Sequence, residues 1–120
     1  MKWNKKFDYP ASSRALVRGH RQYTIGDFKL PSVTTILGQT QSEEKKQKLA
    51  EWRARQGARE ADRQRDLAAA RGTSMHKYLE AYLDGSGHLD MTSLGKEAGN
   101  MARKVIESGL GDLEELWGLE

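Results

Sequence analysis

Hydrophobic residues recur with a helical period in the second half of the chain. Their spacing of i, i+3, i+4, i+7 and i+8 puts them on one face of an amphipathic helix, and the residues concerned are Met75, Tyr78, Leu79, Tyr82 and Leu83. Gly72 and Thr73 stand just before this face. We therefore expect the chain to turn at Gly72 and Thr73 to cap the new helix. The Gly/Ser-rich segment 84–87 predicts where that helix ends.

A second amphipathic helix is expected to begin at Thr92 or Ser93 and to end around residues 108–111. Its predicted inner face consists of Leu94, Ala98, Met101, Ala102 and Val105. The segment that follows, 113–120, has the pattern of a chain entering a strand.

A long charged helix is predicted before these two, from the capping-box pattern at residues 40–43 to about Ala70. Its apolar stripe is narrow and consists of Leu49, Trp52 and several alanines. Gly57 lies in its middle and weakens a helix by about 1 kcal/mol relative to alanine. We expect a break or a tight contact at Gly57.

The first thirty residues contain short β-type runs separated by turn residues. The runs 15–18 and 22–25 are joined across residues 19–21, and Gly26-Asp27 forms a second turn before residues 28–30. This pattern predicts a small hairpin or meander. In the next segment, 31–38, Pro31 suits the first turn of a helix and Gly38 suits its end. One or two helical turns are favoured there, although its β-branched residues keep a strand open as the alternative.

Together these elements predict an α+β chain that is mostly helical, with an N-terminal β-hairpin and about four helices. At 120 residues we expect one domain or a fragment of one. Its parts would be a β-hairpin region (1–30), a helical region (31–110) and the start of a strand (113–120). Only 37% of the residues are hydrophobic and 31% are charged, so the core must be thin.

Composition also limits the chemistry and the compartment. The chain has no cysteine, which excludes disulfides and thiolate metal sites and fits a reducing cytoplasm. No apolar run approaches the length of a membrane span, and the N-terminus lacks the apolar segment of a signal peptide. A net charge of +3 permits nucleic acid as a partner without requiring it.

His76 and Glu80 are the strongest candidates for chemistry. Four residues apart on a helix, an imidazole and a carboxylate lie one above the other at the edge of the apolar face. They form half of a metal site or an acid–base site. The alternative is a surface hydrogen bond with no further role, which is the commoner use of this spacing.

Arg55, Arg59 and Arg63 recur every four residues along the predicted charged helix. One interpretation is a solvated face with salt bridges to Glu51, Glu60, Asp62 and Asp66. The other is a row of cations that contacts a phosphate backbone. The aromatic residues at helical positions, Trp52, Tyr78 and Tyr82, are predicted to pack in the core and not to stack on bases.

Several segments taken together resemble the N-terminal half of RecB-like exonucleases of the PD-(D/E)XK superfamily. The likeness is to the tailed-phage exonucleases and the mitochondrial genome maintenance exonuclease group. It is carried first by the segment Leu-Pro-Ser-Val-Thr-Thr-Ile-Leu at 30–37. The other matches are Leu49, residues 52–55, Gly57, Ala61, residues 69–76, Leu79, Glu80 and residues 82–83.

The resemblance implies a metal-dependent hydrolase that acts on DNA, either single-stranded or at duplex ends. It assigns His76 as a ligand of Mg²⁺ or Mn²⁺ and Glu80 as the catalytic-site carboxylate that supports it. We expect Arg55, Arg59, Arg63 and Arg71 to contact the nucleic acid. The implied compartment is the cytoplasm of a bacterium or of a phage-infected host.

The family pattern continues with a Gly-x-x-Asp on the strand after the last helix and an Asp/Glu-x-Lys on the next strand, and these 120 residues end before both. One imidazole cannot hold Mg²⁺ tightly, so we expect no tight metal binding and no DNA cleavage by this chain alone. A second chain could supply the missing acids. The alternatives are a non-catalytic nucleic-acid-binding module, or a protein-interaction domain that self-associates through the C-terminal strand containing Leu116, Trp117 and Leu119.

Overall fold

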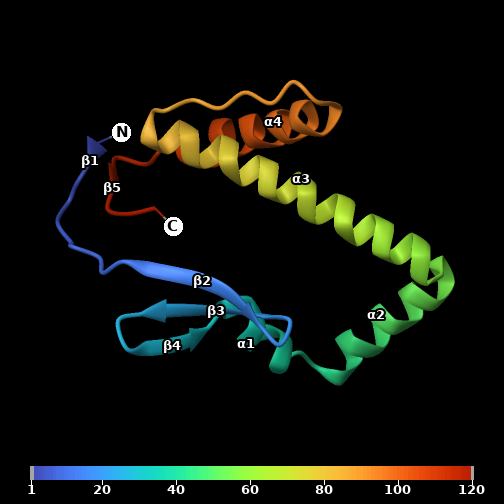
Figure 1. Ribbon diagram of the computed structural model, residues 1–120. Helices are drawn as coiled ribbons and strands as arrows, with labels where there is room; N and C mark the ends of the chain where they lie inside the picture. The colour runs from blue at the N-terminus through green and yellow to red at the C-terminus, as the bar shows by residue number, and fades with distance from the viewer. Residues whose placement is uncertain (1, 120) are drawn as a thin grey trace. The chain divides into compact units, whose positions relative to one another are not determined.

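The fold is described from a computed structural model, for residues 2–119 of the chain (Figure 1). It confirms an α+β chain with four helices and two small sheets. In order, the elements are β1 (Lys2–Trp3), β2 (Ser12–Val17), β3 (His20–Ile25), β4 (Phe28–Pro31), α1 (Val33–Gln39), α2 (Glu43–Gln56), α3 (Ala58–Asp84), α4 (Ser93–Val105), a short π-helical segment η1 (Ile106–Leu110) and β5 (Glu115–Leu116). They divide into two compact units, residues 8–56 and residues 2–7 with 57–119, which are described separately.

The first unit contains an antiparallel meander, β2-β3-β4, as the turn residues predict. The first turn is Arg18 and Gly19, with φ of 54° and 79°, and not residues 19–21 as predicted, since His20 and Arg21 belong to β3. Two consecutive positive φ angles match the right-handed twist of the flanking strands. Gly26, with φ of 59°, begins the second turn, and the register then pairs Tyr23 with Leu30.

Helix α1 confirms the helical prediction for this segment and excludes the strand alternative. Ser32 is its N-cap: its buried hydroxyl accepts a hydrogen bond from the Thr35 N–H at 3.1 Å. Pro31 belongs to β4 and not to the first helical turn, and Gly38 lies inside the helix, so both predicted boundaries were misplaced. The cause is Ser32, because a serine hydroxyl that satisfies an N-terminal N–H fixes the start of a helix more firmly than proline does.

The predicted charged helix is two helices, separated at Gly57 as expected. Helix α2 begins at Glu43, where the Ser42 hydroxyl accepts a hydrogen bond from the Lys45 N–H at 3.3 Å. Thr40 does not open this helix; it is the C-cap of α1. Gly57 has a φ of 84°, a left-handed value that suits glycine and ends α2 before α3 starts.

Helix α3 runs for 27 residues without interruption through Gly72 and Thr73. The predicted turn and new cap at these two residues are therefore wrong. A glycine inside a helix costs about 1 kcal/mol. A break would cost more, since it would leave several backbone groups without partners, and the strong helix formers at 68–70 carry the helix across. The predicted end is confirmed: α3 finishes at Asp84, and Gly85 takes the left-handed conformation.

The second unit is built on the contact of α3 with α4, which lie side by side in Figure 1. Its core consists of small residues: Ser74 and Ala81 of α3 and Ala98 and Ala102 of α4 are buried, as is Gly95. Ala61, near the start of α3, is buried as well. Thr92 caps α4 as predicted, accepting a hydrogen bond from the Gly95 N–H at 3.0 Å. Met101 and Val105, expected on the inner face, are more than one third exposed. The small residues of α4 form the face that contacts α3, and Met101 and Val105 lie to the side of that face.

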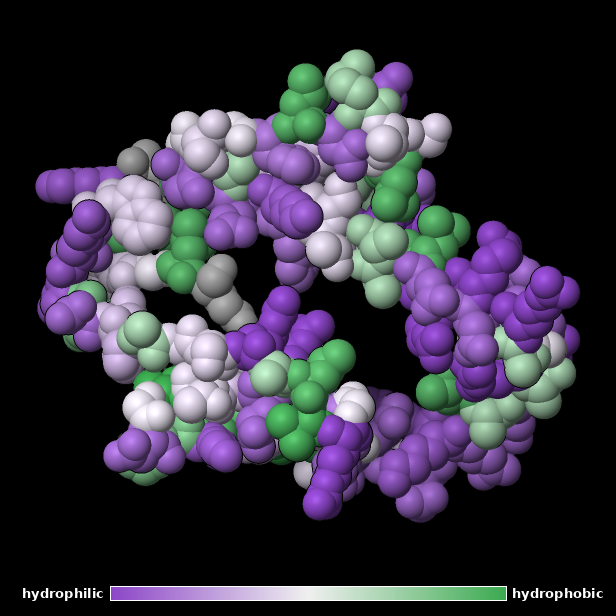
Figure 2. Space-filling view, viewed as in Figure 1, coloured by the Kyte–Doolittle hydropathy of each residue, from purple (hydrophilic) through white to green (hydrophobic). Residues whose placement is uncertain are grey.

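Many large hydrophobic side chains in both units are exposed to solvent, as the green patches in Figure 2 show. No large side chain in the described part of the chain is fully buried. No helix among residues 2–119 is long and apolar enough to cross a lipid bilayer.

The predicted strand near the C-terminus is confirmed as β5, which pairs in parallel with β1. Backbone hydrogen bonds join the Lys2 N–H to the Glu114 carbonyl at 3.1 Å and the Asn4 N–H to the Leu116 carbonyl at 2.8 Å. Beside this pair, the Trp117 ring packs edge-on against Phe7, with centroids 5.5 Å apart. A parallel pair of two-residue strands has little stability by itself. Its edges are open, and further strands could pair with them.

Candidate functional site

His76 and Glu80 lie one turn apart on α3, and both side chains are exposed. The opposite side of the helix holds them in place, because Ser74 and Ala81 are buried in the second unit. Within residues 2–119, neither His76 nor Glu80 forms a hydrogen bond or an ion pair, so the surface hydrogen bond considered above is not formed. Both groups are therefore open to an external ligand.

Metal binding by this part of the chain is limited by the number of donors. In the described residues, no group of three or more histidine, aspartate or glutamate side chains is arranged to hold a metal ion. His76 and Glu80 offer one imidazole nitrogen and one carboxylate. A hard cation such as Mg²⁺ takes six oxygen-rich ligands, more than this pair supplies.

The predicted arginine row is not continuous. Arg55 lies on α2 and Arg59 and Arg63 on α3, and the break at Gly57 interrupts the helical register between them. Arg63 donates two hydrogen bonds to Glu60, from Nε to Oε2 at 2.9 Å and from Nη2 to Oε1 at 2.7 Å. For Arg63 the salt-bridge interpretation holds. Arg55 and Arg59 are exposed and form no ion pair with any described residue.

Arg71 joins the two helices of the second unit. Its Nη1 donates to Glu97 Oε1 on α4 at 2.8 Å, and its side chain is one third exposed. An arginine engaged in this way has fewer donors left for a phosphate. Its predicted contact with nucleic acid would compete with this ion pair.

Glu60 provides a pH-dependent prediction. Hydrogen bonds from Arg63 and Gln64 lower the pKa of Glu60 from 4.5 to about 2. A carboxylate whose pKa is depressed by folding stabilises the helix above its unfolded pKa, and this stabilisation is lost as the pH falls through the folded value. We expect the helicity of the wild-type chain to fall between about pH 4.5 and about pH 2 by more than that of Glu60→Gln.

The measurement is far-UV circular dichroism in an acid titration at low and high salt. Because this pair is solvent-exposed, the difference should shrink at high salt. Glu44→Gln, which removes an exposed carboxylate that pairs with Lys48 on α2, is the matched control. Identical titrations for wild type and Glu60→Gln would show that the pair does not stabilise α3.

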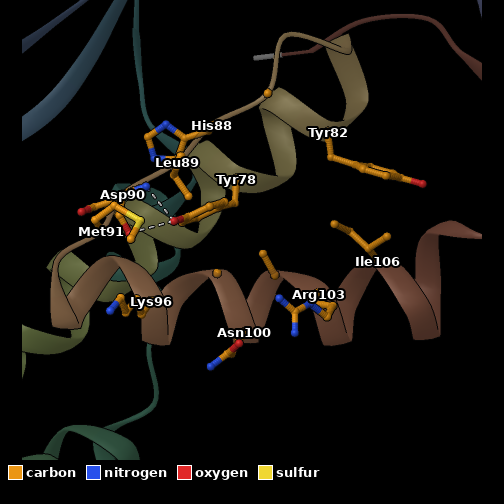
Figure 3. A pocket seen from close by; sticks show the side chains of 13 residues that line it. Tyr78, Tyr82, His88, Leu89, Asp90, Met91, Lys96, Asn100, Arg103 and Ile106 are labelled. Carbon is orange, nitrogen blue, oxygen red and sulfur yellow. Dashed lines mark hydrogen bonds between the residues drawn. The ribbon is translucent and has the colours of Figure 1, made fainter.

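A groove lies between the C-terminal part of α3, the loop 85–92 and α4, with a volume of about 560 Å³ (Figure 3). Tyr78 fixes one wall: its hydroxyl accepts a hydrogen bond from the Asp90 N–H at 2.9 Å and donates one to the Asp90 carbonyl at 3.2 Å. The His88 ring packs edge-on against Tyr78, with centroids 4.6 Å apart. The loop is thereby pinned over α3.

Asp90 couples this loop to the start of α4. Its carboxylate accepts hydrogen bonds from the Thr92 N–H at 3.0 Å and the Thr92 hydroxyl at 2.7 Å. These bonds, with smaller contributions from the positive charges of His88 and Lys77, lower the pKa of Asp90. The sequence analysis gave no role to residues 88–90. The Asp-x-Thr pattern before a helical segment is the local signal that could have indicated this turn.

The prediction that the three helical aromatic residues pack in the core holds for two of them. Tyr78 and Trp52 are half-buried, as expected for packing residues, but Tyr82 is 50% exposed and lines the groove. The prediction that Tyr82 packs in the core is wrong. The contact with α4 is made through Tyr78 and small residues of α3, and Tyr82 lies beside that face.

Comparisons of the chain with protein-family models, with curated proteins and with solved structures find no match. Two features of the chain bear on its function: the open His76–Glu80 pair on α3, and the groove between α3 and α4.

Proposed function

We propose that this chain is the N-terminal part of a metal-dependent DNA exonuclease of the RecB-like type. The observation that carries the proposal is the His76–Glu80 pair, one turn apart, exposed and without partners among the described residues. It is the part of the resemblance with the most specific chemistry. Residues four apart on a helix can bond to each other, and these two do not, so both groups are open to a ligand.

In this proposal His76 supplies a neutral imidazole nitrogen to Mg²⁺ or Mn²⁺, and Glu80 binds or orients the groups around it. The bound ion would polarise the scissile phosphate and activate water. Groups that position a metal ligand affect the affinity of the site for the metal nearly as much as the ligand itself does. The burial of Ser74 and Ala81 on the other side of α3 keeps both side chains facing outward.

The remaining acids and the lysine would come from a segment outside these residues, in the same polypeptide or in a second one. Strands β1 and β5 offer the place where that segment could pair, since a two-stranded parallel sheet has open edges. Arg55 and Arg59, exposed and without ion pairs in the described region, are the cations best suited to contact DNA. The compartment that accompanies this proposal is the cytoplasm of a bacterium or of an infected host.

The proposal is tested by adding Mn²⁺ to the chain and recording the histidine ring signals by NMR. We expect paramagnetic broadening of the His76 ring before that of His20 or His88, and loss of this preference in Glu80→Gln. The chain alone should not cleave labelled DNA, and a polypeptide that carries the Gly-x-x-Asp and Asp/Glu-x-Lys motifs should restore cleavage.

His76→Ala should abolish the restored cleavage, and His20→Ala, the same substitution in β3, should leave it intact. Equal broadening of all three histidines would contradict the metal site. Cleavage by the chain alone that disappears in His76→Ala would show that its ligand set is already complete.

A non-catalytic nucleic-acid-binding module is the second candidate. It is favoured by the small number of metal donors and by the cations along the groove. It predicts DNA binding that is indifferent to His76→Ala and to Mn²⁺.

A further inference from the structure

The groove between α3 and α4 combines an apolar floor with an edge of hydrogen-bonding and cationic side chains. Tyr82, Leu89 and Met91 contribute exposed apolar surface. Lys96, Asn100 and Arg103 follow one another along α4 at i, i+4 and i+7. This spacing puts the three polar groups on one side of the helix, and about 10 Å of helix axis separates Lys96 from Arg103.

The charge along this edge is not neutralised by the protein. Among residues 2–119, neither Lys96 nor Arg103 forms an ion pair. Asp90 also lines the groove, and its hydrogen bonds from the neutral Thr92 leave its negative charge in place. Glu97 is paired with Arg71, and Glu107, four residues after Arg103, forms no ion pair with any described residue. The two cations Lys96 and Arg103 outnumber the carboxylate of Asp90 in the lining, so the groove is net positive, which favours an anionic ligand.

A ligand that fits this arrangement has flat apolar groups and negative charges at regular intervals. Tyr82 presents half of its surface on one side of the groove. Any of the bases can stack on such a ring, so this contact does not depend on the nucleotide sequence. Lys96 and Arg103 would meet successive phosphates, and the Asn100 amide lies between them. Single-stranded nucleic acid has this chemistry, and an acidic peptide lacks the flat rings.

We infer that the α3–α4 groove binds a short stretch of single-stranded nucleic acid, with a base against Tyr82 and its phosphates at Lys96 and Arg103. This inference rests on the proposed function in one respect: the strand in the groove would be the substrate of the nuclease. The binding itself requires neither His76 nor a metal ion. The two proposals can therefore fail separately.

The test is fluorescence anisotropy of labelled oligothymidylate with the full chain, in EDTA and at several salt concentrations. Lys96→Gln should weaken binding about tenfold at low salt and reduce the slope of log K against log salt by about 0.7. Lys104→Gln removes the same charge from the same helix at a position that does not line the groove. It should change the affinity less than twofold.

Stacking is tested with two substitutions at the same residue. Tyr82→Ala should weaken binding about tenfold or more, and Tyr82→Phe, which keeps the ring, should bind as the wild type does. Circular dichroism of each variant checks that α3 is intact. Oligouridylate in place of oligothymidylate shows whether the groove distinguishes RNA from DNA.

Three results would overturn the inference. One is an equal loss in Lys96→Gln and Lys104→Gln, which would indicate diffuse attraction to the basic chain. Another is full affinity in Tyr82→Ala. The third is displacement of the oligonucleotide by polyglutamate of equal charge at the same concentration, which would assign the groove to acidic peptides. If the groove variants lose binding and Mn²⁺ shows no preference for His76, the groove stands and the nuclease proposal falls.

Discussion

Gly95→Ala is expected to destabilise the second unit by about 2 kcal/mol, although alanine is the better helix former. A Cβ at position 95 would overlap the Cβ and carboxyl carbon of Asp90. Asp90 cannot move away at low cost, because Tyr78 holds its backbone and Thr92 binds its carboxylate. Forcing extra atoms into such a contact costs about 1–3 kcal/mol, and each hydrogen bond lost adds about 1 kcal/mol. The gain of about 1 kcal/mol in helix propensity offsets only part of this.

Gly72→Ala is the matched control. Gly72 also lies inside a helix, but a Cβ there would have no atom within 4 Å. It should stabilise the chain by about 0.5–1 kcal/mol. Urea denaturation followed by far-UV circular dichroism compares the two. A stabilised Gly95→Ala would show that Asp90 does not pack over α4, and a destabilised Gly72→Ala would contradict the continuous α3.

Tyr78→Phe is expected to lower the free energy of unfolding by about 1–3 kcal/mol. The tyrosine hydroxyl makes two hydrogen bonds to the backbone of Asp90, one as acceptor and one as donor. Phenylalanine keeps the ring, so the contact with His88 and the packing of the ring beside Gly99 are preserved. The Asp90 N–H would lose its acceptor in a partly buried place, and an unsatisfied group of this kind costs about 1–3 kcal/mol.

Tyr82→Phe tests the same chemical change one turn further along α3, where the ring is 50% exposed. It should alter stability by less than about 0.5 kcal/mol. Amide hydrogen exchange localises the effect: in Tyr78→Phe the amides of the loop 85–92 and the first turn of α4 should exchange faster than in wild type. Equal stability of the two variants would mean that water replaces the hydroxyl without cost.

The helices and strands were largely predictable because their signals are local. Glycines at turns, the hydroxyl of Thr92 and the glycine after Asp84 act on backbone groups within a few residues, and they marked the meander, the start of α4 and the end of α3. Where two local signals competed, as at Pro31 and Ser32, the boundary was misplaced. At Gly72 a local signal was overridden, since the continuity of a helix depends on the residues on both sides.

The candidate site was predictable only as a spacing. Four residues on one helix put His76 and Glu80 on one side, but their exposure and lack of partners follow from the packing of the opposite face of α3. The prediction of one continuous row of arginines was wrong for the same reason. The four-residue spacing continues across Gly57 in the sequence, but the helix ends there. The exposure of Tyr82 could not be read from its period, because Tyr78 and small residues of α3 lie against α4 and Tyr82 lies beside that contact.

The sequence by itself determined the meander, the predominance of helix after it, the lack of cysteine and the thinness of the core. Only the tertiary structure decided that Asp90 closes over Gly95 and Tyr78, that β1 pairs with β5 from the far end of the chain, and that a cationic groove lies beside α4. The physical reason is the separation along the chain of the residues that interact. Caps and turns are satisfied by neighbours along the chain, whereas these contacts join residues whose proximity depends on how whole helices and strands pack.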